Sequence, residues 1–128
     1  MQERSDTLSH IIIGAAIEIH KALGPGLLES AYETCLCHEL KLRSVAYARQ
    51  LELSVTYKGV TMDCGYRLDI IVEQLVIVEL KAVSALEPIH DAQLLTYLRL
   101  RQLWLGLLIN FNVPVLKHGI KRLVNGRM

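Results

Sequence analysis

Apolar residues recur at helical spacing along the first third of the chain. This spacing predicts one helix over residues 5–23 and a second over residues 27–43. The stretch LGPG at 23–26 separates them, because glycine readily adopts a left-handed C-cap and proline stops a helix. The residues expected to face the core are Leu8, Ile11, Ile12, Ala15, Ile19 and Leu23 in the first helix, and Leu28, Tyr32, Cys35, Leu36 and Leu40 in the second.

From about residue 45 the period changes to two, which is typical of β-strands. Strands are expected over residues 51–57, 60–63, 66–72 and 75–83. The last two should form an antiparallel hairpin that turns near Glu73-Gln74.

Helical spacing returns over residues 89–103, just after Pro88, which suits the first turn of a helix. The residues expected to face the core here are Ile89, Ala92, Leu95 or Leu94, and Leu98. A fully apolar strand over 103–111 and a short edge strand near the C-terminus complete the pattern. This order predicts one α/β domain over residues 1–128 with a mixed sheet.

Composition narrows the class of protein. The chain has 128 residues, of which 52% are hydrophobic and 21% charged, so a globular domain is expected and a disordered chain is excluded. The formal net charge is only +1, so any phosphate-binding surface must be local. A basic cluster near the C-terminus is most simply a solvated surface. It consists of Lys117, His118, Lys121, Arg122 and Arg127.

The sequence points to the cytoplasm and away from a membrane. Its three cysteines give no disulfide framework, and its polar start is unlike a signal peptide. The longest uncharged run, residues 103–116, is too short to span a bilayer.

The stretch VIVELKAV at 76–83 places two charges inside an apolar strand, where unpaired charges are costly. Glu79 and Lys81 are two residues apart, so their side chains project from the same face. Asp69 interrupts the preceding apolar strand in the same way. A three-residue hairpin loop would put Asp69 directly opposite Glu79, whereas a two-residue loop would put the two acids on opposite faces.

Two adjacent carboxylates repel each other and favour protonation, and a divalent cation removes that conflict. Mg²⁺ commonly takes one or two carboxylates together with water and phosphate, and it lowers the pKa of a bound water. Lys81 could orient that water or stabilise the developing negative charge. The structural alternative is that Glu79 and Lys81 form ordinary ion pairs at the end of the sheet.

These residues form a D-x(9)-E-x-K pattern across the predicted hairpin, and the following helix carries QLLTY at 93–97, a Q-x-x-x-Y motif. The stretch GLLESAY at 26–32 has G-x-x-E-x-x-Y spacing. Together these motifs resemble the PD-(D/E)XK nuclease superfamily, its exonuclease-like branch and, within it, the GxxExxY protein family, over nearly the whole chain. Leu68 stands where the superfamily name has proline, which is often absent.

The resemblance implies a restriction-endonuclease-like α/β core, in which a mixed sheet is flanked by helices. It implies that Asp69 and Glu79 bind the metal ion with the backbone carbonyl of Leu80, and that Lys81 is the catalytic lysine. An iron–sulfur cluster, which some relatives carry, needs four cysteine ligands and is rejected here.

Residues outside the hairpin have two interpretations each. By resemblance, Glu29 is a further acid near the metal, but it also suits the positive end of a helix dipole. Gln93 and Tyr97 share one helix face, and by resemblance they line the site and position substrate; otherwise they are a polar residue and a buried ring. His20 could approach Glu29 as a metal ligand, as in some relatives, or be a surface or capping histidine.

We therefore expect a nuclease that uses Mg²⁺, with Mn²⁺ as an alternative, to hydrolyse DNA with a metal-activated water. RNA or nucleotide substrates fit the same chemistry, and a non-catalytic nucleic-acid-binding or assembly module is the other class of function. The apolar strand 103–111 and the positive mean hydropathy favour a homodimer, and the small size leaves room for an unidentified protein partner. Candidate phosphate contacts are Arg99, Arg101, Lys117, Lys121 and Arg122.

Overall fold

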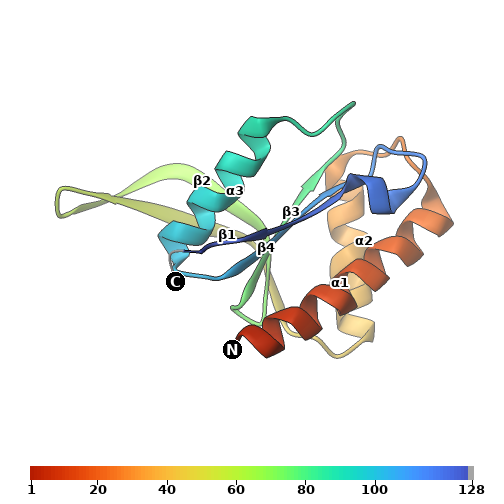
Figure 1. The fold of residues 1–128 in the computed structure, drawn as a ribbon, viewed down its shortest axis with the longest axis horizontal. Helices are drawn as coiled ribbons and strands as arrows, with labels where there is room; N and C mark the ends of the chain where they lie inside the picture. The colour runs from red at the N-terminus through yellow and green to blue at the C-terminus, as the bar shows by residue number, and fades with distance from the viewer. Residues whose placement is uncertain (127–128) are drawn as a thin grey trace.

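The structure, a computed structural model, describes residues 1–126, so Arg127 lies outside the described residues. Its elements follow in chain order (Figure 1). They are α1 (Gln2–Leu23), α2 (Glu29–Leu42), β1 (Tyr47–Tyr57), β2 (Val60–Val72), β3 (Val76–Lys81), α3 (Pro88–Arg101), β4 (Leu105–Asn110), the 3₁₀ helix η1 (Leu116–Gly119) and β5 (Ile120–Val124).

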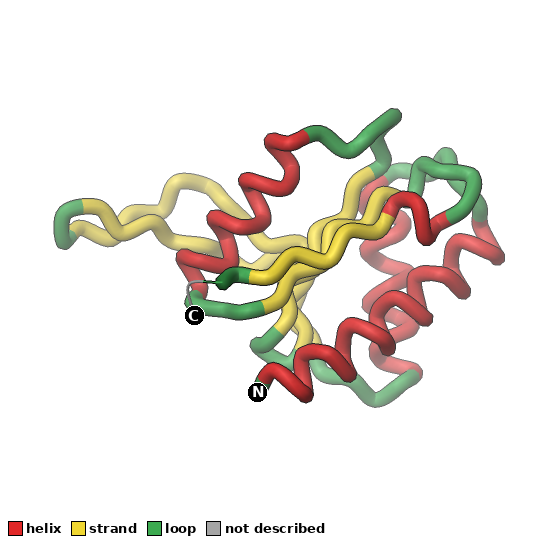
Figure 2. The backbone as a smooth tube through the Cα atoms, viewed as in Figure 1, coloured by secondary structure: helices red, strands yellow, loops and turns green. Residues whose placement is uncertain are grey.

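The five strands form one sheet in the order β1-β2-β3-β4-β5. Strands β3 and β4 are parallel and the other neighbours are antiparallel, so the sheet is mixed, as the sequence predicts. Helix α3 supplies the crossover that a parallel pair requires. Helices α1 and α2 cover one face of the sheet and α3 covers the other (Figure 2). This α/β arrangement is consistent with a restriction-endonuclease-like core.

The sheet has a hydrophobic core on each face. On the side of α1 and α2, Tyr32 and Phe111 are fully buried among aliphatic residues of both helices and of alternate strand positions. On the side of α3, Leu94 and Leu98 pack on the other strand positions, including Ile77. The strands β3 and β4 are therefore buried on both faces, which explains why their sequences are continuous apolar runs.

The region expected to hold two strands, 60–63 and 66–72, is a single strand, β2. A register shift between Leu53 and Ser54 of β1 lets the pairing continue past the interruption in the alternation, and Gly65 supplies a positive φ of 80° there. The resulting β1–β2 hairpin extends well beyond the helices (Figure 1). All of residues 60–67 are exposed.

Several residues expected in the core lie outside it. Leu23 and Leu28 are 46% and 77% exposed, because they flank the turn between α1 and α2, where the chain leaves the sheet. Ile89 is 69% exposed and Ala92 is also exposed, because the first turns of α3 border a surface groove. Of the two alternatives offered for the middle of this helix, Leu94 is fully buried.

Strand β4 does not offer the association surface that its sequence suggests. All six of its residues are buried, and it is paired on both sides, so its apolar surface is consumed within the monomer. Strand β4 therefore does not support the homodimer that its apolar sequence suggests. Within residues 1–126, none of the helices combines the length and hydropathy needed to cross a bilayer.

Candidate active site

The β2–β3 hairpin settles the register that the sequence leaves open. Val72 pairs with Val76, so the loop has three residues. Glu73 and Gln74 both have positive φ, and the amide of Leu75 donates to the carbonyl of Val72 at 2.9 Å. A two-residue loop of Glu73 and Gln74 would pair Val72 with Leu75, so including Leu75 in the loop shifts β3 by one position. The shift puts the two acids on the same face.

Asp69 and Glu79 face each other where the two strands diverge. The backbone ladder ends at the pair Ile70–Val78, one position before the acids. Beyond that point, the amide of Asp69 donates to Oε2 of Glu79 and the amide of Leu80 donates to Oδ2 of Asp69, both at 2.9 Å. The carboxylates thus replace the strand-to-strand bonds, and these contacts fix both side chains.

One oxygen of each carboxylate is left for a ligand. Oδ1 of Asp69 and Oε1 of Glu79 have no hydrogen-bond partner among the described residues, and no polar side-chain atom there is both buried and unpartnered. These two oxygens therefore reach solvent. Glu79 as a residue is nevertheless only 5% exposed.

Burial and mutual repulsion disfavour the state in which Asp69 and Glu79 are both ionised. Burial, followed by the charge of Asp69, raises the pKa of Glu79 to about 8. Burial also raises the pKa of Asp69, although the hydrogen bond from Leu80 opposes the rise. Two neighbouring carboxylates with raised pKa values are typical of a functional site.

Lys81 lies at the end of β3 on the same face as Glu79. Its charge lowers the pKa of both acids, yet it forms no ion pair with any described residue. Glu79 likewise forms no ion pair with a described residue, so the alternative that these two residues form ordinary ion pairs at the end of the sheet is wrong. The chain just beyond Lys81 is fixed by Asn110, whose side chain bonds both the amide and the carbonyl of Val83.

Gln93 and Tyr97 reach the same region from α3. Together with Lys81 they line one groove between α3 and the β1–β2 hairpin. Burial and then the charge of Glu79 raise the pKa of Tyr97, and a hydrogen bond from Gln93 partly offsets this rise. The structure thus brings both Q-x-x-x-Y residues into the groove that Lys81 also lines, and Tyr97 lies within range of the charge of Glu79.

The G-x-x-E-x-x-Y segment forms the turn before α2 and its first helical turns. Gly26 has φ of 104°, a conformation that favours glycine. Tyr32 is fully buried and stacks on Phe111 with ring centroids 4.2 Å apart. Its hydroxyl donates to the carbonyl of Gly24 at 2.6 Å and accepts from the amide of Leu27 at 3.2 Å. The glycine and tyrosine of this segment are therefore structural.

The same turn leaves Glu29 exposed at the first position of α2. Its negative charge raises the pKa of Asp69, so it lies near the acids without a hydrogen bond to them. It borders a separate hollow of about 550 Å³, which also contacts Ala82, the residue after Lys81. Glu29 is thus close to the site but is not part of the bonded pair.

Glu33, one turn further along α2, is a site neighbour that the sequence interpretation missed. It is 6% exposed, and its charge raises the pKa of both Asp69 and Glu79. Arg49 binds its Oε2 at 2.7 Å, and the Gln50 side chain donates to its Oε1 at 2.7 Å. A signal existed, because Glu33 lies four residues after Glu29 and so shares its helix face.

His20 is neither a surface residue nor a neighbour bonded to the acids. It is 8% exposed in the last turn of α1, and its Nε2 lies 2.8 Å from the carbonyl of Val113. It therefore connects α1 to the loop after β4.

Some of the candidate phosphate contacts already have side-chain partners, and others form no ion pair with a described residue. Lys121 pairs with Asp91, and Arg122 pairs with Asp6 and lies over the Trp104 ring. These pairs agree with a solvated surface. The side chain of Arg101 donates to Gln74. The exposed residues Arg99 and Lys117 form no ion pair among the described residues.

The donor set suits a hard divalent cation that completes its coordination with water and substrate. Among the described residues, no three His, Cys, Asp or Glu side chains are grouped so as to hold a metal ion by themselves. Asp69 and Glu79 instead provide two adjacent carboxylates, each with a free oxygen, and their charges repel in the absence of a cation. Mg²⁺ is usually bound by one or two carboxylates in this manner.

Comparison with known proteins agrees with this geometry. The family model of the PD-(D/E)XK nuclease superfamily matches residues 6–123. No curated protein and no solved structure gives a significant match. The matched segment contains the hairpin acids, Lys81 and all the elements that position them. The chain therefore belongs to the PD-(D/E)XK nuclease superfamily.

Proposed function

We propose that this protein is a Mg²⁺-dependent nuclease that hydrolyses phosphodiester bonds of DNA, with Mn²⁺ as a substitute ion. One observation carries the proposal. Asp69 and Glu79 are held side by side by reciprocal hydrogen bonds, with an unpaired Lys81 on the same face. This acid–acid–lysine set is complete, which does not favour the alternative of a non-catalytic binding module.

The proposed roles follow from what each group can do. Asp69 and Glu79, with the carbonyl of Leu80, would hold the cation, which when bound supplies Lewis acidity and lowers the pKa of a coordinated water. The Lys81 ammonium would orient the attacking water or stabilise negative charge that develops on the phosphate. Being unpaired, it can do so without first breaking an ion pair.

The surrounding residues would position the substrate. Gln93 and Tyr97 line the groove next to Lys81 and are proposed to contact it. Glu29, which borders the hollow beside Ala82, is proposed as an outer acid, and its spacing with Gly26 and Tyr32 supports membership of the GxxExxY family. A DNA substrate, a cytoplasmic setting and an additional protein partner complete the proposal.

Nuclease assays of the native chain and Lys81→Ala test this proposal. Linear and circular DNA, single- and double-stranded, together with RNA, would be incubated with Mg²⁺, Mn²⁺ or EDTA. We expect cleavage of DNA that requires the ion and falls at least about 100-fold in the variant, as for other groups that stabilise transition-state charge. Lys41→Ala is the matched control, because Lys41 is an exposed lysine at the other end of α2 from Glu29.

Three results would refute the proposal. They are the absence of cleavage with every ion and substrate, cleavage that persists in EDTA, and cleavage that is unaffected by Lys81→Ala. Cleavage of RNA alone would refute the DNA assignment and leave the metal chemistry intact.

A further inference from the structure

A groove runs from the candidate active site onto the projecting hairpin. Its volume is about 730 Å³, within the range of small-molecule binding sites. Lys81 is part of its lining, and the larger apolar and aromatic side chains of the lining come from two elements. They are Val55 and Tyr66 from the hairpin and Ile89, Tyr97 and Leu100 from α3.

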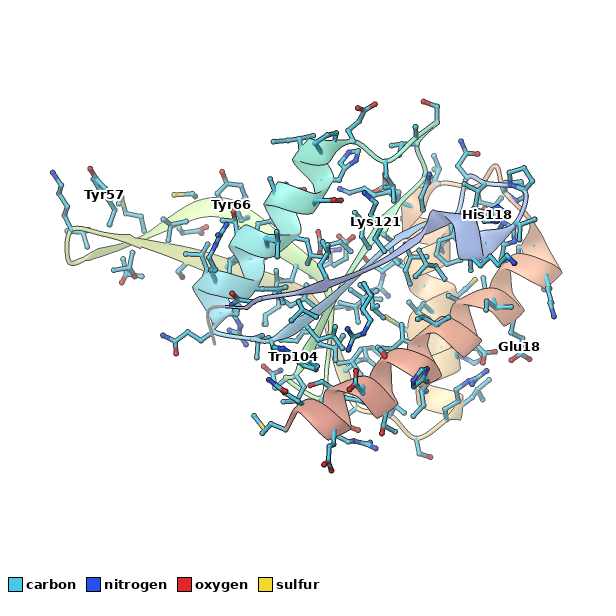
Figure 3. All side chains as sticks on the ribbon, viewed as in Figure 1. Glu18, Tyr57, Tyr66, Trp104, His118 and Lys121 are labelled. Atoms are coloured by element: carbon cyan, nitrogen blue, oxygen red, sulfur yellow. The ribbon has the colours of Figure 1, made fainter. Side chains whose placement is uncertain are left out.

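Tyr66 presents an aromatic surface to this groove. It is 45% exposed although it is a large ring, and it lies at the base of the hairpin beside α3 (Figure 3). Tyr97, which is only 5% exposed, supports it with a centroid distance of 6.1 Å and an interplanar angle of 60°. A half-exposed ring that rests on a buried ring is a fixed platform for stacking.

The charges around the groove do not suit a path for the phosphate backbone. The lining contains one lysine, Lys81, and His90, whose Nδ1 already accepts a hydrogen bond from the amide of Glu87. Nucleic-acid backbones are held by several basic groups, whereas bases stack on aromatic side chains. The exposed Ile89 and Leu100 would likewise gain from contact with a base.

We propose that this groove binds an unpaired nucleobase, stacked on Tyr66, next to the phosphate at Asp69 and Glu79. This inference rests on the proposed function, because Lys81 belongs both to the groove and to the acid site. In a duplex the face of each base is covered by its neighbours and exposing it costs unstacking energy, so a base that stacks here is most readily supplied by a single strand or a frayed end. The substrate class is therefore DNA with an unpaired nucleotide at the point of cleavage.

Binding and cleavage experiments with Tyr66 variants test this inference. Binding would be measured in the Lys81→Ala background with Mg²⁺, using a single-stranded oligonucleotide that carries 2-aminopurine, a fluorescent base that is quenched on stacking. We expect Tyr66→Ala to weaken single-strand affinity about 5- to 150-fold, the usual effect of losing one base–aromatic stack, and to abolish the quenching. Tyr66→Phe keeps the ring and should keep both.

The matched control is Tyr57→Ala, because Tyr57 is a 61% exposed tyrosine at the tip of the same hairpin and does not line the groove. It should bind as the parent does. A blunt duplex without unpaired bases should be bound equally by the Lys81→Ala parent and by the Tyr66→Ala, Tyr66→Phe and Tyr57→Ala variants made in it. In the native background, Tyr66→Ala should slow cleavage of single strands more than Tyr66→Phe, with unchanged thermal unfolding.

The outcomes separate this inference from the proposed function. If the native chain cleaves DNA in a metal-dependent way but Tyr66→Ala does not change single-strand binding, the base site would be overturned and the proposed nuclease function would stand. Equal losses for single strands and blunt duplex would also overturn it. If quenching depends on Tyr66 but the native chain cleaves no substrate, the base site would be supported and the proposed nuclease function would be overturned.

Discussion

Replacing Glu79 with glutamine should change how the stability of the protein depends on pH. The carboxyl group of Glu79 is buried beside Asp69, and this raises its pKa from 4.5 to about 8. In an unfolded chain the group titrates near its ordinary value. Between these two pH values the folded protein therefore holds a proton that the unfolded chain has released, so the free energy of unfolding falls as pH rises through this interval.

The size of the effect follows from the pKa difference. About 3.5 pH units at about 1.4 kcal/mol per unit give about 5 kcal/mol for the whole titration in the absence of metal. On the order of 4 kcal/mol of this is lost between pH 4.5 and pH 8, because each pKa lies at one end of that interval. Glutamine carries no charge, and its side-chain oxygen can still accept the hydrogen bond from the amide of Asp69. Glu79→Gln should thus be the more stable protein at pH 8 and differ little from the native chain at pH 4.5.

Thermal unfolding of both proteins, followed by circular dichroism in EDTA at several values from pH 4.5 to pH 9, tests this reasoning. We expect the Tm of Glu79→Gln to exceed the native Tm at pH 8 by ~10 °C or more. Excess Mg²⁺ at pH 8 should raise the native Tm and leave the variant unchanged, because the ion stabilises only the state that binds it. Glu52→Gln, an exposed carboxylate paired with Arg67, is the control and should follow the native curve. Parallel pH curves for the native protein and Glu79→Gln would refute the reasoning.

Two further predictions concern residues that support the site. Tyr32→Phe keeps the stacked ring but loses both hydrogen bonds to the turn before α2, which should lower the free energy of unfolding by about 1–3 kcal/mol in urea titrations; an unchanged midpoint would show that the turn is held otherwise. Gly119→Ala places a Cβ 2.2 Å from the carbonyl oxygen of Asn110 and should cost at least about 2 kcal/mol in the same assay, whereas Gly126→Ala meets no atom within 4 Å and should be neutral within about 0.5 kcal/mol. Equal midpoints for the two alanine variants would contradict a steric clash between the added Cβ at position 119 and the carbonyl oxygen of Asn110.

The acid pair was predictable because its chemistry conflicts with its surroundings. Charged residues in apolar strands require a reason, and the spacing of Asp69, Glu79 and Lys81 supplied one. Their register was not predictable. Glu73 and Gln74 both adopt positive φ, but neither is a glycine or an asparagine, the residue types from which such a turn can be predicted.

Other features depend on contacts between segments that are distant in sequence. Arg49 and Gln50 of β1 bind the carboxylate of Glu33, and the position of Glu33 near the start of α2 cannot by itself show these contacts. The continuity of β2 depends on a register shift in its partner strand. The helical period also cannot show that the first turns of α3 border a surface groove, which is why Ile89 was expected in the core and is exposed.

The position of the acids explains how an apolar strand can carry them. Strand β3 is paired on both sides up to Val78, and a charged side chain within that ladder would face only apolar neighbours. At Glu79 the pairing with β2 has ended, and backbone amides that would otherwise lack partners are satisfied by the two carboxylates. The divergence of the strands thus provides both the space for a ligand and the donors that fix the acids. It follows that Leu75, by setting the register, determines whether Asp69 completes this site or points instead toward the core beneath α1 and α2.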